Sequence, residues 1–129
     1  MEKIERIVLG NLDPAPLTPI FGHLQTTEVI ITDERIRHIK ERHPEDFRLF
    51  EEYGQETVLL PDMLTRDGKH TGTVFAVKKL PDTNLNVVLR LVLDTDDPDF
   101  KNSVMTFYRL RERNLKKLLE KNQLRYTRE

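Results

Sequence analysis

The sequence predicts a single α+β domain in which helices precede an antiparallel sheet of about four strands and a basic helix follows the sheet. Three observations favour this class. The 129 residues are enough for one hydrophobic core and few for two. Apolar residues recur with a helical period of 3.6 before Asp62 and with a period of two after it. Connections between the later apolar runs are short, which favours antiparallel pairing of successive strands.

Residues 1–27 predict an irregular N-terminal segment ahead of the core over residues 28–129. Pro14, Pro16 and Pro19 remove backbone donors and oppose a helix. Before these prolines, the run Ile4–Leu9 is compatible with a short strand. We therefore expect one domain with an irregular surface connection near its start.

Two consecutive helices are predicted next. The apolar β-branched run Val29–Ile31 leads into a helix at Thr32 or Asp33, both of which favour the N-cap position. This helix should end at His43, because a following proline disfavours helical geometry. A second helix restarts at Pro44, which is acceptable as a first helical residue.

The later part of the chain predicts four strands, a helix and an edge strand. The four strands cover Met63–Thr65, Thr73–Lys79, Asn84–Leu93 and Asn102–Arg109. A helix over Arg111–Lys121 and an edge strand over Gln123–Thr127 follow.

Alternation along the strands predicts which side chains share a face of the sheet. The core side should carry Leu85, Val87, Leu89, Leu91 and Leu93, together with Phe75, Val77, Met105 and Phe107. The opposite, partly open face should then bring together Lys78, Arg90, Thr106 and Tyr108.

Composition excludes several classes of site. The chain has no cysteine, so disulfides, thiolate metal sites and cysteine nucleophiles are excluded. No apolar run approaches the roughly 18 residues of a membrane span, and the start of the chain does not resemble a signal peptide. We therefore expect a cytoplasmic protein without membrane contact.

The net charge of −1 conceals a gradient along the chain. Residues 101–129 carry nine Lys or Arg and three Glu, whereas residues 1–100 carry twelve basic and nineteen acidic side chains. The basic end could bind a polyanion, or it could be a solvated helix whose charge is balanced by acidic neighbours.

Two histidines, His38 and His43, are candidates for proton transfer near neutral pH. Arg37 and Arg42 precede them and could bind phosphate through two parallel hydrogen bonds. The alternatives are that His38 is simply exposed and that His43 packs at a helix end. Five residues of spacing would point the two rings about 140° apart on a helix, so we predict neither a catalytic metal nor another cofactor.

The strands supply further candidates for phosphoryl transfer. Lys78 and Arg90 could stabilise a phosphorane, while Ser103, Thr106 or Tyr108 could hold a phosphate oxygen or help to move a proton. The alternative is that these are ordinary polar residues on the solvated face of a half-buried sheet.

Two motifs together resemble a known nuclease group. The segment Val29–Pro44, followed by Asn102–Tyr108 and a basic helix, is similar to the phage-encoded barnase, EndoU, colicin and RelE-like nuclease domains, the BECR superfamily. The resemblance covers roughly residues 20–129 and the order of helices, sheet and helix.

The resemblance implies a metal-independent endoribonuclease of the toxin or effector type, associated with phages or a host cell. By position it suggests His38, His43, a basic strand residue such as Lys78, and Ser103 or Thr106. The last two fall on opposite faces of a regular strand, so both can line one site only if a bulge or a strand end lies between them.

Two functional hypotheses follow. The first is an endoribonuclease that uses 2′-hydroxyl transphosphorylation, with RNA such as tRNA as substrate and a cognate inhibitor protein as a further partner. Its RNA-binding residues would be Arg37, Arg42, Tyr108, Arg109, Arg113, Lys116 and Lys117. The second is a non-catalytic, phage-associated module that binds RNA or protein through its basic surface, including Arg111.

Overall fold

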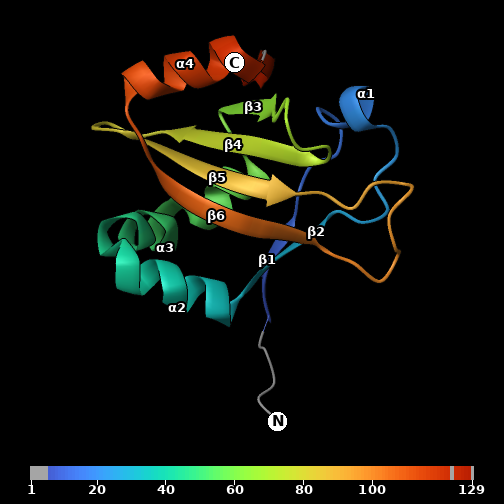
Figure 1. The fold of residues 1–129 in the computed structure, drawn as a ribbon, viewed down its shortest axis with the longest axis horizontal. Coiled ribbons are helices and arrows are strands. Elements are labelled where there is room, and N and C mark those ends of the chain that lie inside the picture. The colour runs from blue at the N-terminus through green and yellow to red at the C-terminus, as the bar shows by residue number, and fades with distance from the viewer. Residues whose placement is uncertain (1–5, 123, 129) are drawn as a thin grey trace.

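A seven-stranded mixed sheet organises the residues that the computed structural model describes, 6–122 and 124–128 (Figure 1). The strands are β1 (Arg6–Asn11), β2 (Glu28–Thr32), β3 (Met63–Arg66), β4 (Thr73–Lys79), β5 (Asn84–Arg90), β6 (Asn102–Leu110) and β7 (Leu124–Thr127). Their order in space is β1-β2-β6-β5-β4-β3-β7. β2 and β6 are parallel, and the other neighbouring strands are antiparallel.

The predicted fold class, helices followed by a four-stranded antiparallel sheet, is therefore wrong. β1 and β2 precede the two long helices and belong to the same sheet as the later strands. The run Val29–Ile31 is not just the approach to a helix, because it forms the middle of β2 beside β6. This pairing joins segments far apart in the chain, so the short connections of the meander could not indicate it.

Four helices accompany the strands in the described residues. They are α1 (Thr18–Phe21), α2 (Asp33–Arg42), α3 (Pro44–Leu59) and α4 (Glu112–Asn122). The hydroxyl of Thr32 accepts a hydrogen bond from the Arg35 amide at 3.2 Å and caps α2. None of these helices is long and apolar enough to cross a membrane.

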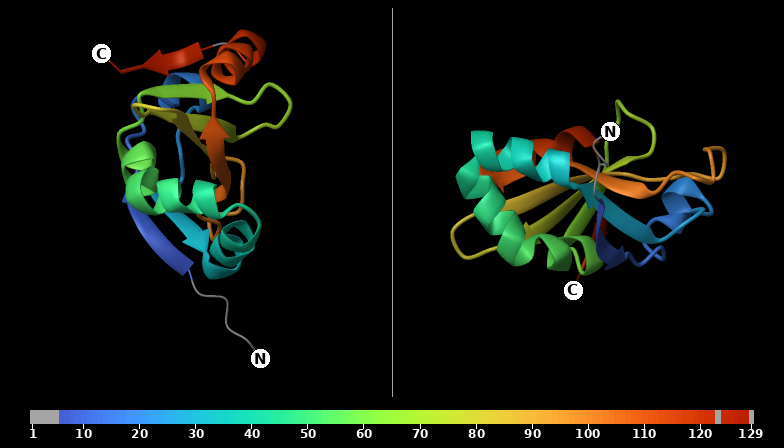
Figure 2. Two further views of the ribbon diagram at one scale, coloured as in Figure 1. Left: turned by 90° about the vertical axis from the view of Figure 1, so that its left-hand side faces the viewer. Right: turned by 90° about the horizontal axis from the view of Figure 1, so that it is seen from below.

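The main core lies between α3 and the sheet. The rings of Phe50 and Phe107 stack there, with centroids 3.9 Å apart and planes 9° apart. Leu85, Val87 and Leu89 point to this side, as the alternation predicted. In Figure 2, α2 and α3 form a helical pair on one flank of the sheet, while α4 lies at the other end of the molecule.

The N-terminal segment takes part in this core and is not irregular throughout. β1 pairs with β2, and the segment buries Leu9, Leu12, Leu17 and Leu24. The expectation that its prolines oppose a helix is wrong for α1, because Pro19 stands in the first turn, where a missing backbone N–H costs no helical hydrogen bond. Ile4 and Gln123, which the sequence pattern assigns to strands, lie outside the described residues.

A smaller apolar cluster lies under α4, where Leu115 packs with Val77 and Leu110. Apolar residues are thus buried on both faces of β4, one face against α4 and the other in the main core.

The two covered faces of β4 reverse the side predicted for its apolar residues. The sequence pattern directs Phe75 and Val77 into the main core, but the main core receives Val74 and Ala76 instead. Phe75 pairs with Val88 and therefore lies on the same side of the sheet as Val77. Alternation cannot indicate the core side of a strand that is covered on both faces.

Candidate functional site

The face of the sheet that points away from α3 carries several of the predicted site residues. Val87 and Phe107 pair across β5 and β6 and lie in the main core, so their chain neighbours point to the other side. We call this side the open face; α4 covers it over β3 and β4. On β5 and β6 the open face carries Asn86, Val88, Arg90, Ser103, Thr106 and Tyr108.

A β-bulge in β6 puts Ser103 and Thr106 on this same face. Val88 pairs with Thr106, whereas the next residue of β5, Leu89, pairs with Val104. Met105 is the additional residue on β6, and its side chain is 40% exposed instead of pointing into the core as predicted. The bulge therefore meets the condition under which both hydroxyl groups can face one site.

A pocket of about 390 Å³ lies at the end of this face, where β2, β5 and β6 meet. Its polar side chains are those of Arg6, Thr32, Arg90, Asp96, Asp99, Lys101 and Ser103. Its apolar wall includes Ile30, Val92 and Phe100. Two of the predicted catalytic residues, Arg90 and Ser103, thus line one cavity, and they are direct partners across the strands.

The guanidinium of Arg90 is held in place from several sides. Its Nη1 donates to the carbonyl oxygen of Leu91 at 2.6 Å, and its Nη2 lies 3.6 Å from a carboxylate oxygen of Asp96. Gly72, with φ of +82°, lies directly against the group, and a Cβ atom there would collide with it. The Arg90 side chain is still 39% exposed, so it remains accessible to an anion.

The pocket contains two further cations that the sequence pattern does not indicate, Arg6 and Lys101. Lys101 lies 3.7 Å from Glu28, and Arg6 has no ion pair among the described residues. The pocket lining holds three basic side chains and two carboxylates; Asp96 pairs with Arg90, and Glu28, outside the lining, pairs with Lys101, so Arg6 is the lining cation that has no ion-pair partner among the described residues. Arg6 reaches this site through the β1–β2–β6 arrangement, for which the sequence held no signal.

Lys78 does not belong to the open face, contrary to the prediction. It is paired with Leu85, on the α3 side of the sheet, and is only 8% exposed. Its Nζ lies 3.2 Å from Glu56 of α3 and 3.9 Å from Asp62. These carboxylates compensate the charge of Lys78 inside the fold, so Lys78 does not converge with Arg90.

The two predicted histidines are exposed and lie outside the pocket. His38 is on the outer side of α2, and His43 lies at the junction where α2 ends and α3 begins. Among the described residues, neither imidazole forms a hydrogen bond or an ion pair. Of the arginines beside them, Arg37 lies 3.5 Å from Asp33 on the same helix, and Arg42 is exposed.

Tyr108 and Thr106 continue the open face away from the pocket. The Asn86 amide Nδ2 donates to the Tyr108 hydroxyl at 2.9 Å, and Tyr108 packs beside the cluster under α4. The Asn86 side chain is fully buried, and its Oδ1 has no hydrogen-bond partner in the part of the chain that the structure describes. Tyr108 therefore helps to hold α4 against the sheet. Thr106 lies closer to the pocket along β6 than Tyr108 does.

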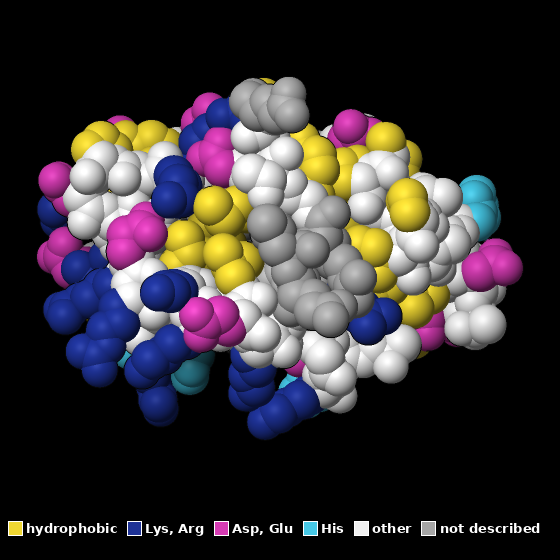
Figure 3. Space-filling view, turned by 90° about the horizontal axis from the view of Figure 1, so that it is seen from above, with side chains coloured by type: hydrophobic (Ala, Val, Ile, Leu, Met, Phe, Trp, Pro, Cys, Tyr) yellow, Lys and Arg dark blue, Asp and Glu magenta, His cyan; other side chains and the backbone are white. Residues whose placement is uncertain are grey.

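The predicted basic surface is present on α4. Arg113 and Lys116 line a shallow groove of about 400 Å³ together with Lys79 and Glu112, and Lys117 is exposed. No ion pair between described residues involves Arg113, Lys116 or Lys117. Figure 3, which views the α4 side, shows Lys and Arg side chains gathered along one margin of the molecule.

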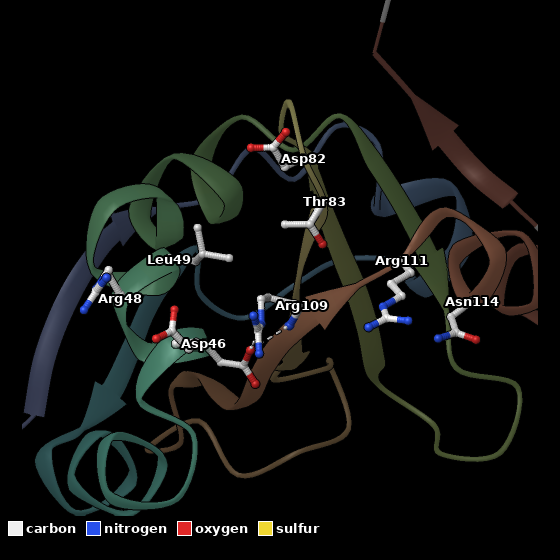
Figure 4. Close-up of a pocket in the computed structure, with 9 residues that line it drawn as sticks. Asp46, Arg48, Leu49, Asp82, Thr83, Arg109, Arg111 and Asn114 are labelled. Atoms are coloured by element: carbon white, nitrogen blue, oxygen red, sulfur yellow. Dashed lines mark hydrogen bonds and ion pairs between the residues drawn. The ribbon is translucent and has the colours of Figure 1, made fainter.

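A larger pocket, of about 600 Å³, is less suited to an anion because its charges balance. Arg109 lines it and pairs through Nε with a carboxylate oxygen of the buried Asp46 at 2.7 Å (Figure 4). Its ionisable residues are Glu45, Asp46, Arg48, Asp82, Arg109 and Arg111. The predicted RNA-binding residue Arg109 thus has a partner within the fold.

Within the described residues, no three His, Asp or Glu side chains are grouped so that they could hold a metal ion. No protein family, curated protein or solved structure matches this chain.

Proposed function

We propose that this protein is a metal-independent endoribonuclease whose phosphate site is the pocket around Arg90 and Ser103. In the proposed reaction the 2′-oxygen of a ribose bonds to the adjacent phosphorus, and the bond from phosphorus to the 5′-oxygen breaks. The 2′-hydroxyl gives its proton to a base, and the leaving 5′-oxygen receives a proton. The products end in a 2′,3′-cyclic phosphate and a 5′-hydroxyl.

The observation that carries this proposal is the bulge at Met105. It aligns Ser103 with Arg90 on the open face and turns Thr106 to the same side. A fixed guanidinium and a hydroxyl group are suited to the oxygens of a phosphate whose charge increases during the reaction. The hydroxyl of Ser103 has only a weak contact, 3.9 Å from the Met105 sulfur, so it is available to a ligand.

The cations around this pair suit a polymer better than a single phosphate. Arg6 and Lys101 lie in the same pocket, and Arg113, Lys116 and Lys117 of α4, which form no ion pair with another described residue, lie on the same side of the sheet. A strand of RNA presents a phosphate at every nucleotide, so several of these cations can each neutralise one. The same proposal includes a cytoplasmic location, a role as a toxin and a cognate protein that inhibits the enzyme.

Cleavage of RNA in the presence of EDTA tests the function. The purified protein should cut RNA, leave a matched DNA intact because DNA lacks the 2′-hydroxyl, and produce 2′,3′-cyclic phosphate ends. Ser103→Ala should slow the cutting, and Arg48→Ala, which removes an exposed arginine of α3 outside the Arg90 pocket, is the control. Cleavage of the DNA, or dependence on a divalent ion, would contradict the proposed chemistry.

The alternative is a non-catalytic module that binds RNA or protein, and one observation favours it. The two helix histidines lie outside the pocket, so the pocket lacks the proton carriers that the sequence suggested. A binding module would retain RNA at low salt and release it unchanged. Sequencing the RNA ends after incubation distinguishes the two functions directly.

A further inference from the structure

A histidine and an aspartate form a hydrogen-bonded pair on the loop between β3 and β4. The Nδ1 atom of His70 lies 2.9 Å from Oδ2 of Asp67. The His70 side chain is 72% exposed, whereas that of Asp67 is only 14% exposed. If Nδ1 carries the proton, the carboxylate fixes this tautomer and leaves the Nε2 lone pair directed at solvent. This is the arrangement in which an imidazole acts as a base.

The loop that carries the pair is well supported. Asp67 Oδ1 accepts from the Lys69 amide at 2.8 Å, and the Gly68 amide donates to Asn122 of α4 at 3.0 Å. Partial burial alone would raise the pKa of Asp67, but hydrogen bonds from the His70 ring and the Lys69 amide outweigh it and lower the pKa below its usual value. Asp67 is therefore ionised at neutral pH.

The same loop leads directly to Arg90. Thr73, the first residue of β4, pairs with Arg90, and its amide donates to the His70 carbonyl oxygen at 3.1 Å. Gly72 lies against the Arg90 guanidinium, and its carbonyl accepts from the Leu91 amide at 2.8 Å. Figures 1 and 2 show this loop beside the end of β5, projecting on the side of the sheet where α4 lies.

We infer that His70 is the general base of the site around Arg90, and that Asp67 is its positioning residue. The inference rests on the proposed ribonuclease function. His70 Nε2 would accept the 2′-hydroxyl proton as the 2′-oxygen bonds to phosphorus. The 5′-oxygen would leave with a proton from solvent water. His38 and His43 lack a carboxylate partner among the described residues, and neither lies on a segment that contacts Arg90.

Replacement of His70 gives the direct test. His70→Ala should lower kcat on RNA by about 100-fold to 10,000-fold with little change in KM. Because the side chain is 72% exposed, Tm should change by no more than a few degrees. Free imidazole should restore part of the lost rate, since it can enter the space left by the ring. His23→Ala removes another exposed loop histidine and serves as the matched control.

A double-mutant cycle tests the role of Asp67. Asp67→Asn should lower kcat by about tenfold or more in the wild-type background. The same change should have no further effect on kcat in the His70→Ala background, because a positioning residue acts only through the group it positions. Equal losses in both backgrounds would overturn the assignment of Asp67.

The outcomes separate this inference from the proposed function. If wild type cleaves RNA and His70→Ala retains full kcat, the role of His70 is overturned and the ribonuclease function stands. Lost activity that imidazole does not restore and that accompanies a fall in Tm of more than a few degrees would also overturn it. A wild-type protein that does not cleave RNA would overturn both.

Discussion

Lys78 and Arg90 are two basic residues on adjacent strands, and the fold uses them in opposite ways. Lys78 lies on the α3 side, nearly buried, with Glu56 and Asp62 as partners. Arg90 is on the open face, partly exposed, and lines a pocket with Ser103. A nearly buried cation with two carboxylate partners contributes to folding, whereas a partly exposed cation with one backbone carbonyl and one carboxylate as partners remains available to an anion.

The two cations also differ in the groups that bind them. The carboxylate of Asp62 forms an ion pair with Lys78 and accepts hydrogen bonds from the Lys79 amide at 2.8 Å and the Arg128 guanidinium at 2.6 Å. It therefore connects its own segment with β4 and with the end of the chain at Arg128. Arg90 is held by the Leu91 carbonyl and one carboxylate. Loss of Lys78 should therefore appear in stability, and loss of Arg90 in activity.

The largest effect should come from Arg90. Arg90→Ala should lower kcat for RNA cleavage by about 100-fold to 1,000-fold, the usual loss when one positioned donor to a developing charge is removed. Stability should change little, because the side chain is partly exposed. Single-turnover kinetics and Tm measure the two quantities, with Arg48→Ala as the control. Unchanged kinetics would place the phosphate elsewhere.

Lys78→Met should produce the reverse pattern. It keeps most of the apolar stem but leaves Glu56 and Asp62 without their buried cation, which we expect to cost about 2 kcal/mol of unfolding free energy. Urea unfolding measures this loss, and kcat per folded molecule should be unchanged. A large fall in kcat without a loss of stability would contradict this prediction and show that Lys78 takes part in catalysis.

The exposed cations of α4 concern the affinity for RNA and not the rate of cleavage. Replacing Arg113, Lys116 and Lys117 together with Ala should weaken RNA binding regardless of sequence. The dependence of log affinity on log salt should become shallower by about one unit for each phosphate that is no longer neutralised. Titrations at several salt concentrations measure the slope. A slope equal to that of wild type would show that α4 does not contact RNA.

The smallest expected effect is on the pH dependence of stability, and it comes from the exposed pair of Lys79 and Glu112. Lys79 follows Lys78 in β4 and points to the other side of the sheet. Hydrogen bonds from Lys79 at 3.1 Å and then from Asn84 lower the pKa of Glu112. A lowered folded-state pKa adds stability that is present above the unfolded-state pKa of about 4.3 and is lost as pH falls through the folded value. The stability difference between wild type and Glu112→Gln should therefore exist at pH 6 and vanish in stronger acid. A constant difference across this range would contradict the pairing.

The local elements were predictable because their signals are local. Thr32 caps α2 and Pro44 begins α3, as the capping and proline rules indicated. The strands from β3 to β6 follow one another in antiparallel pairs, because short connections permit little else. The candidate site was only partly predictable: Arg90 and Ser103 share a pocket, whereas His38, His43 and Lys78 lie outside it.

Local signals in the sequence were enough to place α2, α3 and α4 to within about a residue, to pair β3, β4, β5 and β6 with their chain neighbours, and to choose the residues of β5 that enter the core, but they did not indicate α1. Three features appear only in the folded chain: the parallel pairing of β2 with β6, the burial of β4 on both faces and the bulge at Met105. Each of these depends on contacts between segments distant in the chain. Local propensity and periodicity carry no information about such contacts, and these contacts bring Arg6, Arg90 and Ser103 into one pocket.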